Sequence, residues 1–261
     1  MLSSTYHFLR HWWTAQSRYA VHSPFVYTFV TELLPNRKSP AGTRIDALRE
    51  SLSHSEERLE IRDFGAGYGG DARPVIHKDV REVVRGSARR RAQGEFLARL
   101  TAAYRPERIL ELGTNLGFSA AYLLSGHPES HLYSLEGAPS LARMAKINLE
   151  ALGYRADIRV GEFGETLPSV LSEGKKLDFV LLDGNHQYAP TVKYFGQIAP
   201  QVRDGGLIIV DDINWSAGMR KAWQELRARE EVSVSVDLFW MGLCFLRRNQ
   251  SKQHFRFRMP Y

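Results

Sequence analysis

Residues 109–119 read Ile-Leu-Glu-Leu-Gly-Thr-Asn-Leu-Gly-Phe-Ser, and this segment is the strongest indication of the fold in the sequence. An apolar run at 109–112 leads into a turn that contains Gly113 and Gly117, and a helical segment follows at 119–124. Glycine lets the backbone turn tightly and lets a ligand come close to it. A strand, a glycine-rich turn and a helix are the first three parts of a nucleoside-binding site.

The fourth part of such a site is a second strand that ends in an acid, whose carboxylate accepts hydrogen bonds from the ribose hydroxyls. The apolar run 132–135 ends at Glu136, 19 residues after Gly117. The usual spacing is about 20 residues. The sequence therefore predicts a nucleoside cofactor held by the glycine turn and Glu136.

Further along, the chain alternates short apolar runs with helical segments such as 140–152 and 189–202. The expected strands are residues 109–112, 132–135, 158–160, 179–182 and 207–210. This β-α alternation predicts a mostly parallel sheet with helices on both faces.

Two more strands are expected after a helix at 219–230. The apolar runs 232–238 and 242–246 are separated by only three residues. Three residues are too few for a crossover helix, so these runs should form an antiparallel hairpin at the end of the sheet. The expected core is an α/β domain over residues 96–246 with a mostly parallel seven-stranded sheet.

Residues 1–95 follow another pattern, and we expect them to form a helical N-terminal extension that packs over this core. They contain a second glycine-rich stretch, 63–70, which reads Asp-Phe-Gly-Ala-Gly-Tyr-Gly-Gly and follows a short apolar run at 59–61. No second strand is expected after it, because the chain becomes basic at Arg81 and Arg85. We therefore interpret 63–70 as a backbone bend or an active-site cover.

The net charge of +6 is unevenly distributed along the chain. Residues 1–95 carry a net +4, residues 96–246 a net −3, and residues 247–261, a basic C-terminal tail, a net +5. A nucleic-acid groove would gather basic side chains on the binding domain. The acidic core therefore favours a small-molecule acceptor, and a nucleic-acid substrate stays as the alternative.

The single cysteine, Cys244, excludes an internal disulfide and a thiolate zinc site, which favours a reducing, cytoplasmic location. No stretch approaches the roughly 18 uncharged apolar residues of a membrane-spanning helix. We therefore expect a cytoplasmic protein without a membrane span.

Acids follow the last two parallel strands that we expect. Asp183 follows the strand at 179–182, and Asp211 and Asp212 follow the next one. Ligands of open α/β sheets bind outside the carboxyl ends of the strands. Three carboxylates brought together repel one another unless a cation joins them, and Mg²⁺ prefers such oxygen ligands. His186, three residues after Asp183, can take a proton near neutral pH.

The motif Glu111-Leu-Gly-Thr-Asn-Leu-Gly-Phe-Ser119 resembles the Glu-x-Gly-Thr-x-x-Gly-Tyr-Ser of class I S-adenosylmethionine-dependent methyltransferases, which have a Rossmann-like fold. It is most similar to the metal-dependent O-methyltransferases, the group that includes the catechol and caffeoyl-CoA enzymes. The likeness runs from about residue 93 to residue 246. It implies S-adenosylmethionine (SAM) as cofactor and methyl transfer to a hydroxyl oxygen.

The resemblance also implies roles for individual residues. Ser119 would hold the cofactor carboxylate, Glu136 the ribose hydroxyls, and Glu162 and Phe163 the adenine, although Phe163 as a core aromatic is the alternative. The cofactor-binding residues that it implies are Glu111, Gly113, Thr114, Asn115, Gly117, Ser119, Glu136, Gly137, Glu162, Phe163 and Asp183.

In the same group, an Asp after the fourth strand and an Asp-Asn pair after the fifth bind the metal. The resemblance implies Asp183, Asp211 and Asp212 as metal ligands, with Asp212 in place of the Asn. It implies His186 and Asp183 as catalytic residues, with His186 standing where the catechol-type enzymes commonly have a Lys. A non-catalytic protein of the same fold and a homodimer stay open.

Overall fold

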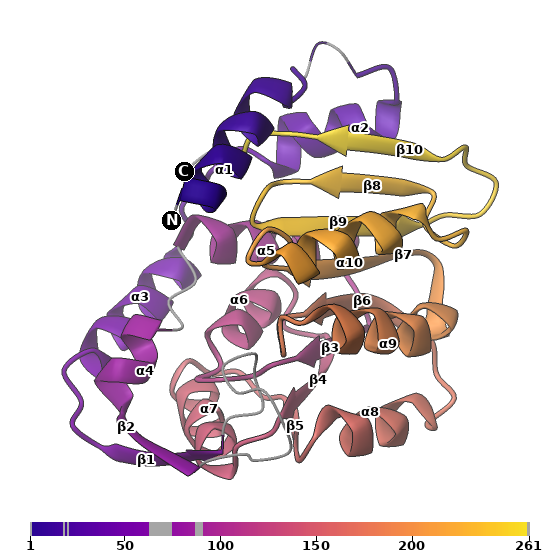
Figure 1. Cartoon of the computed structure of the whole chain (residues 1–261). Helices are drawn as coiled ribbons and strands as arrows, with labels where there is room; N and C mark the ends of the chain where they lie inside the picture. Colours follow the sequence, from indigo (N-terminus) through magenta and orange to yellow (C-terminus); the bar gives the residue numbers. More distant parts are fainter. Residues whose placement is uncertain (1, 18, 20, 63–74, 87–90, 260–261) are drawn as a thin grey trace. The chain divides into compact units, whose positions relative to one another are not determined.

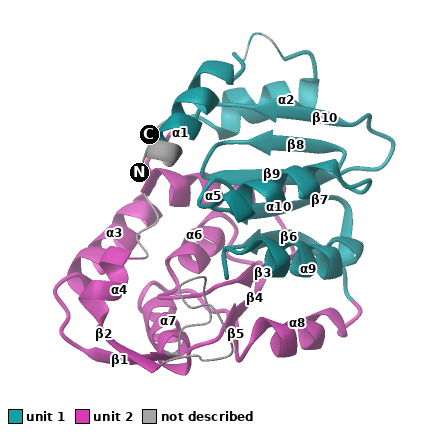
Figure 2. Cartoon of the chain, viewed as in Figure 1, with its two compact units in different colours: residues 1–35, 175–261 teal, residues 36–174 magenta. Residues whose placement is uncertain are grey.

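The computed structural model describes residues 2–17, 19, 21–62, 75–86 and 91–259. The chain forms two compact units (Figure 2). Unit 1 comprises residues 1–35 and 175–261, and unit 2 comprises residues 36–174. The division into an extension, a core and a tail at residues 95 and 246 stays a prediction. The glycine-rich stretch 63–70 lies outside the described residues.

Unit 2 is built on three parallel strands, each followed by a helix (Figure 1). The strands are, in sheet order, β3 (Arg108–Leu112), β4 (His131–Glu136) and β5 (Asp157–Val160). The helices that follow them are α6 (Phe118–Gly126), α7 (Pro139–Ala151) and α8 (Phe163–Leu171). The β-α alternation predicted for this part of the sequence is confirmed.

In the described part of unit 2, the remaining elements are three helices and a separate pair of strands. The helices are α3 (Pro40–Leu52), α4 (Val80–Gly86) and α5 (Arg91–Tyr104). The strands β1 (Arg58–Arg62) and β2 (Val75–Asp79) pair antiparallel. The expectation that no strand follows residues 63–70 is therefore wrong. Since β1 and β2 are antiparallel neighbours, they form a hairpin and not the parallel unit of a nucleoside site.

Unit 1 carries the other five strands of the main sheet. Their order is β10 (Gln253–Arg256), β8 (Val234–Asp237), β9 (Met241–Leu246), β7 (Val202–Asp211) and β6 (Leu177–Leu182). The pair β6 and β7 is parallel, and β9 is antiparallel to both β7 and β8, as the predicted hairpin requires. Every residue of β6 is buried, which is typical of a parallel strand covered on both faces.

Strand β10 makes eight strands in the main sheet over the described residues, one more than predicted. It pairs parallel with β8 and lies within the stretch that the sequence analysis interpreted as a basic tail. Phe255 and Phe257 are 8% and 2% exposed, whereas Arg258 is exposed. The aromatic residues between the arginines are what place this segment on the sheet.

The helices of unit 1 are α1 (Leu2–Thr14), α2 (Pro24–Thr28), the π-helix η2 (Phe29–Leu33), α9 (Tyr188–Ile198), the 3-10 helix η3 (Ala199–Gln201) and α10 (Ala217–Ala228). The side chain of Ser216 caps α10 by accepting from the N–H of Met219. Among the helices described, none is long and apolar enough to cross a bilayer.

Candidate active site

In unit 2, the glycine turn joins β3 to α6 with the backbone conformation that only glycine adopts easily. Gly113 has φ 101° and Gly117 has φ 82°, both left-handed. A Cβ atom on Gly117 would lie 3.2 Å from the Cβ of Ala145. Gly117 is also the N-cap of α6, and Ser119 lies in the first turn of that helix. The turn therefore presents the N-terminus of α6, which favours an anionic group such as a carboxylate.

Glu136, the last residue of β4, braces this turn. Its Oε2 accepts from the N–H of Asn115 at 2.8 Å, and its Oε1 accepts from the N–H of Ala138 at 2.9 Å. Burial raises the pKa of Glu136, although the N–H groups of Ala138 and Asn115 act against that rise. Each carboxylate oxygen keeps a second lone pair, so the group can still accept from two hydroxyls. This arrangement suits the predicted ribose acceptor.

A buried polar chain supports the turn from within the strands. The Oγ of Ser134 on β4 donates to Oε2 of Glu111 at 2.5 Å and lies 2.6 Å from Oγ1 of Thr114. All three side chains are buried. Ser134 is a site residue that was not predicted, although a serine inside an apolar run was the available signal. Glu111 and Thr114 thus tie β3 to β4, and their contact with a cofactor stays a prediction.

The end of β5 lies beside the end of β4. The N–H of Gly161, which has φ 141°, donates to the carbonyl oxygen of Glu136 at 2.9 Å. Glu162 is the N-cap of α8, and the half-buried Phe163 is the first residue of that helix. The structure therefore brings the expected ribose and adenine segments together at the carboxyl ends of adjacent strands. Gly137 directly follows Glu136, and the adenine contacts themselves stay predictions.

In unit 1, acids end the neighbouring strands β6 and β7. Asp183 directly follows β6, and Asp211 is the last residue of β7 and is 8% exposed. The next residue, Asp212, has φ 51°, a conformation that few non-glycine residues adopt. Backbone strain of this kind gathers at functional sites.

The imidazole of His186 lies beside two of these acids. Its Nε2 is 3.9 Å from Oδ1 of Asp183, and its Nδ1 is 3.9 Å from Oδ2 of Asp212. His186 itself has φ 36°. The loop after β6 therefore presents His186 to both acidic strand ends, and a proton taken up by the ring would lie beside two negative charges.

The same side chains do not form a closed metal site. Within the described residues, no three of His, Cys, Asp and Glu are grouped so that they could hold a metal ion. The ring of His186 contacts Asp183 and Asp212 on either side. Carboxylate oxygens suit Mg²⁺ chemically, and metal binding by Asp183, Asp211 and Asp212 stays a prediction.

The loop after β7 is held by a turn that the sequence analysis did not identify. Nδ2 of Asn214 donates to the carbonyl oxygen of Phe239 at 2.8 Å, and Phe239 has φ 72°. The N–H of Trp215 donates to the carbonyl oxygen of Asp212 at 2.9 Å, and Trp215 is 70% exposed. An exposed tryptophan therefore stands next to the acids on a loop that these two hydrogen bonds hold.

Comparisons with known proteins show that the chain is similar to methyltransferases. A family model described as a methyltransferase domain matches residues 110–213. A catechol O-methyltransferase of Mycobacterium tuberculosis is 33% identical over 130 residues, which cover 49% of this chain and 57% of the relative. A catechol O-methyltransferase of Niastella koreensis is 31% identical over 125 residues, which cover 46% and 56%. This chain thus spans between one half and two thirds of the length of these relatives.

Among solved structures, an O-methyltransferase from Bacillus cereus in complex with SAH superposes with a TM-score of 0.54. The two chains are 19% identical, and the match covers 84% of this chain and 96% of that one. At this identity the likeness shows the fold. Residues 110–213 thus match a methyltransferase-domain family model, in a chain whose mixed α/β fold is the Rossmann-like fold of its structural neighbours.

Proposed function

We propose that this protein transfers the methyl group of SAM to a hydroxyl oxygen of a small molecule. The observation that carries the proposal is the buried carboxylate of Glu136, which accepts from the N–H of Asn115 at the end of β4. One hydrogen bond thus connects the glycine turn to the carboxylate that we expect to accept from the ribose hydroxyls. The names of the two catechol O-methyltransferase relatives support a small hydroxyl-bearing acceptor.

In the proposed cofactor site, the left-handed glycines let the backbone approach the methionine part of SAM. Ser119 and the N-terminus of α6 take its carboxylate, and Glu136 accepts from both ribose hydroxyls. Phe163, half-buried at the start of α8, offers a ring face to the adenine. These roles follow the order in which β3, β4 and β5 end along the sheet.

The proposed reaction is a direct displacement. The acceptor oxygen forms a bond to the methyl carbon while the carbon–sulfur bond breaks, and sulfur keeps that electron pair as S-adenosylhomocysteine (SAH) forms. The hydroxyl proton goes to an imidazole nitrogen of His186, beside Asp183 and Asp212. A positioned general base contributes about 10²–10⁴-fold to a rate. The protein supplies orientation and the proton acceptor, and no covalent enzyme intermediate forms.

Magnesium is a separate prediction, and no step above depends on it. Asp183, Asp211 and Asp212 are the residues that would hold the ion, where it would make an acceptor hydroxyl more acidic. Activity that is lost in EDTA and restored by Mg²⁺ would confirm the prediction. Activity unchanged by EDTA would contradict it.

Mass spectrometry of reaction mixtures tests the proposed function. Purified protein is incubated with SAM carrying a deuterated methyl group and a panel of small phenols, catechols and sugars, with RNA as a further substrate. We expect the label on the oxygen of a small molecule. Label on RNA, or label on none of these substrates despite bound SAM, would contradict the proposal. The cytoplasmic location and a homodimer stay predictions.

A further inference from the structure

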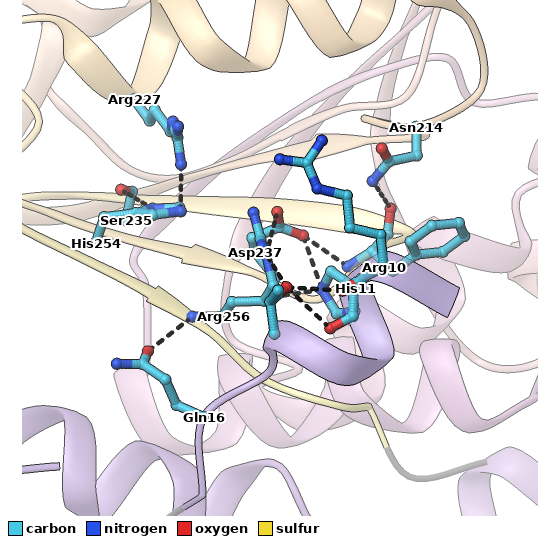
Figure 3. A network of polar contacts seen from close by, with 11 residues as sticks. Arg10, His11, Gln16, Asn214, Arg227, Ser235, Asp237, His254 and Arg256 are labelled. Carbon is cyan, nitrogen blue, oxygen red and sulfur yellow. Dashed lines mark hydrogen bonds and ion pairs between the residues drawn. The ribbon is translucent and has the colours of Figure 1, made fainter. Parts of the chain in front are cut away.

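In unit 1, Asp237 links the helix α1 to the C-terminal part of the chain. We call the contacts of His11, Asp237 and Arg256 the clasp. Nε2 of His11 lies 3.1 Å from Oδ1 of Asp237, and Nε of Arg256 lies 3.4 Å from Oδ2 (Figure 3). His11 and Asp237 are 6% and 5% exposed. A buried carboxylate between two basic side chains joins α1, β8 and β10 at one point.

Contacts further along the same segments strengthen this clasp. The N–H of Gln16 donates to the carbonyl oxygen of Arg256 at 2.7 Å, and the N–H of Arg256 donates back to Oε1 of Gln16 at 3.1 Å. Nη2 of Arg258 donates to the carbonyl oxygen of Trp12 at 2.8 Å, and its guanidinium lies 3.9 Å from the Trp12 ring centroid. The orientation of α1 on unit 1 is thereby fixed.

The helix α1 carries apolar side chains on two opposite faces. Phe8 packs edge-to-face on Phe239, with ring centroids 5.0 Å apart, on the same side as His11. Three other side chains are exposed, Tyr6 by 61%, Leu9 by 50% and Trp13 by 82%. Their spacing of three and four residues places them along one face of a helix. This face is apolar and in contact with solvent.

Two segments next to the clasp, residues 1–31 and residues 238–261, contain basic residues but no acidic ones. Residues 1–31 contain Arg10 and Arg18 and no Asp or Glu. Residues 238–261 contain Arg247, Arg248, Lys252, Arg256 and Arg258 and no Asp or Glu. Arg10 and Arg258 are exposed. We call Tyr6, Leu9, Arg10 and Trp13, together with Arg258 on the adjacent Trp12, the terminal face.

We propose that the terminal face binds the surface of an anionic lipid bilayer. Tyrosine and tryptophan favour the interface between headgroups and acyl chains, and nearby arginines are attracted to anionic headgroups. Pairing of two terminal faces would instead bring like charges together without a carboxylate from residues 1–31 or 238–261 to compensate them. The aliphatic Leu9 on this face favours a lipid over stacked nucleic-acid bases.

The surface lies on segments outside residues 110–213, the part of the chain that the methyltransferase family model matches. Binding of a bilayer at this place would bring the protein to acceptors that partition into membranes. The inference does not depend on the proposed methyl transfer, because vesicle binding is measured without SAM.

Vesicle sedimentation with the full-length protein tests the inference. The probes are vesicles of phosphatidylcholine alone and vesicles of phosphatidylcholine and phosphatidylglycerol in equal parts. We expect binding to the mixed vesicles that weakens with added salt, and little binding to phosphatidylcholine alone. The triple variant Tyr6→Ser, Leu9→Ser, Trp13→Ser should bind about tenfold more weakly or worse, because it loses most of the insertable apolar area.

A matched control separates this face from general surface hydrophobicity. Ile147, on α7 of unit 2, is 48% exposed, and Ile147→Ser should bind vesicles like the wild type. Thermal melting and SAH binding check that the triple variant is folded. The inference is overturned if the folded triple variant binds vesicles like the wild type, or if the wild type binds no mixed vesicles. A dimer that the triple variant dissociates, or RNA binding that it abolishes, would assign the face to those partners instead.

Discussion

The backbone N–H of Asn115 donates to Oε2 of Glu136 at 2.8 Å, across the gap between two neighbouring strand ends. Asn115 lies in the glycine turn after β3, and Glu136 ends β4. The contact fixes the distance between the element expected to approach the methionine part of SAM and the carboxylate expected to hold its ribose. A cofactor that fits both would therefore find them already in position.

Replacement of Glu136 tests the ribose-binding role. Glu136→Gln keeps the shape of the side chain but removes its charge and one of its two acceptor oxygens. Hydrogen bonds to charged groups contribute about 1.5–3 kcal/mol each, so we expect SAH to bind about 10–100-fold more weakly. Calorimetry measures the affinity. The exposed Glu165 on α8 supplies the control, and Glu165→Gln should bind SAH like the wild type. Equal affinities for the wild type and Glu136→Gln would remove Glu136 from the cofactor site.

Gly117 is expected to tolerate no side chain. Gly117→Ala places a Cβ at φ 82° and 3.2 Å from the Cβ of Ala145. Left-handed backbone costs about 1–2 kcal/mol for a residue with a Cβ, and the crowding adds to that cost. Both the melting temperature and the SAH affinity should fall. A Cβ on Gly164 would meet nothing within 4 Å, so Gly164→Ala should lower neither. A stable Gly117→Ala that binds SAH normally would refute this account of the turn.

His186→Ala separates proton transfer from cofactor binding. The variant should lose about 10²–10⁴-fold in kcat, because the proton acceptor beside Asp183 and Asp212 is gone. Its SAM affinity should match that of the wild type. The exposed His54 of unit 2 gives the matched control, and His54→Ala should keep its kcat. If His186→Ala turns over at the wild-type rate, another group takes the proton.

The pH dependence of stability tests the clasp at Asp237. Burial acts to raise the pKa of Asp237, but the hydrogen bond and charge of His11, the N–H of Phe239 and the charge of Arg256 outweigh it, so the pKa lies below its ordinary value. A lowered carboxyl pKa contributes stability above the unfolded-state pKa, and this contribution is lost as the pH falls through the lowered folded-state value.

Asp237→Asn should therefore lower the free energy of unfolding near pH 7 by about 2 kcal/mol or more. The gap between variant and wild type should close as the pH falls through the folded-state pKa of Asp237. Thermal melts at neutral and acidic pH measure it. A gap of constant size at every pH would show that the charge of Asp237 does not stabilise the clasp.

The main features of the sheet could be predicted because its strands are apolar runs bounded by Gly, Asp or Glu. Strand β10 could not be predicted in this way, because it is not an apolar run. Arginines alternate with the buried Phe255 and Phe257, and such a segment resembles an exposed basic tail. Strand β2 was missed for a similar reason, since Val75 and Ile76 are followed directly by His77 and Lys78.

The site was predictable in its residue types and less so in its contacts. The spacing from Gly117 to Glu136 identified the turn and its acid. Ser134 is visible only once β3 and β4 are paired, because its partners Glu111 and Thr114 lie on another strand and its turn. The contact between Asn214 and Phe239 joins residues 25 positions apart, and no local sequence pattern predicts it.

Calorimetric titration of the purified protein with SAM tests whether the glycine turn and Glu136 form a cofactor site. We expect saturable binding with one SAM per chain, which Glu136→Gln weakens while leaving the protein folded. A wild-type protein that stays folded and gives no binding heat with millimolar SAM would contradict it.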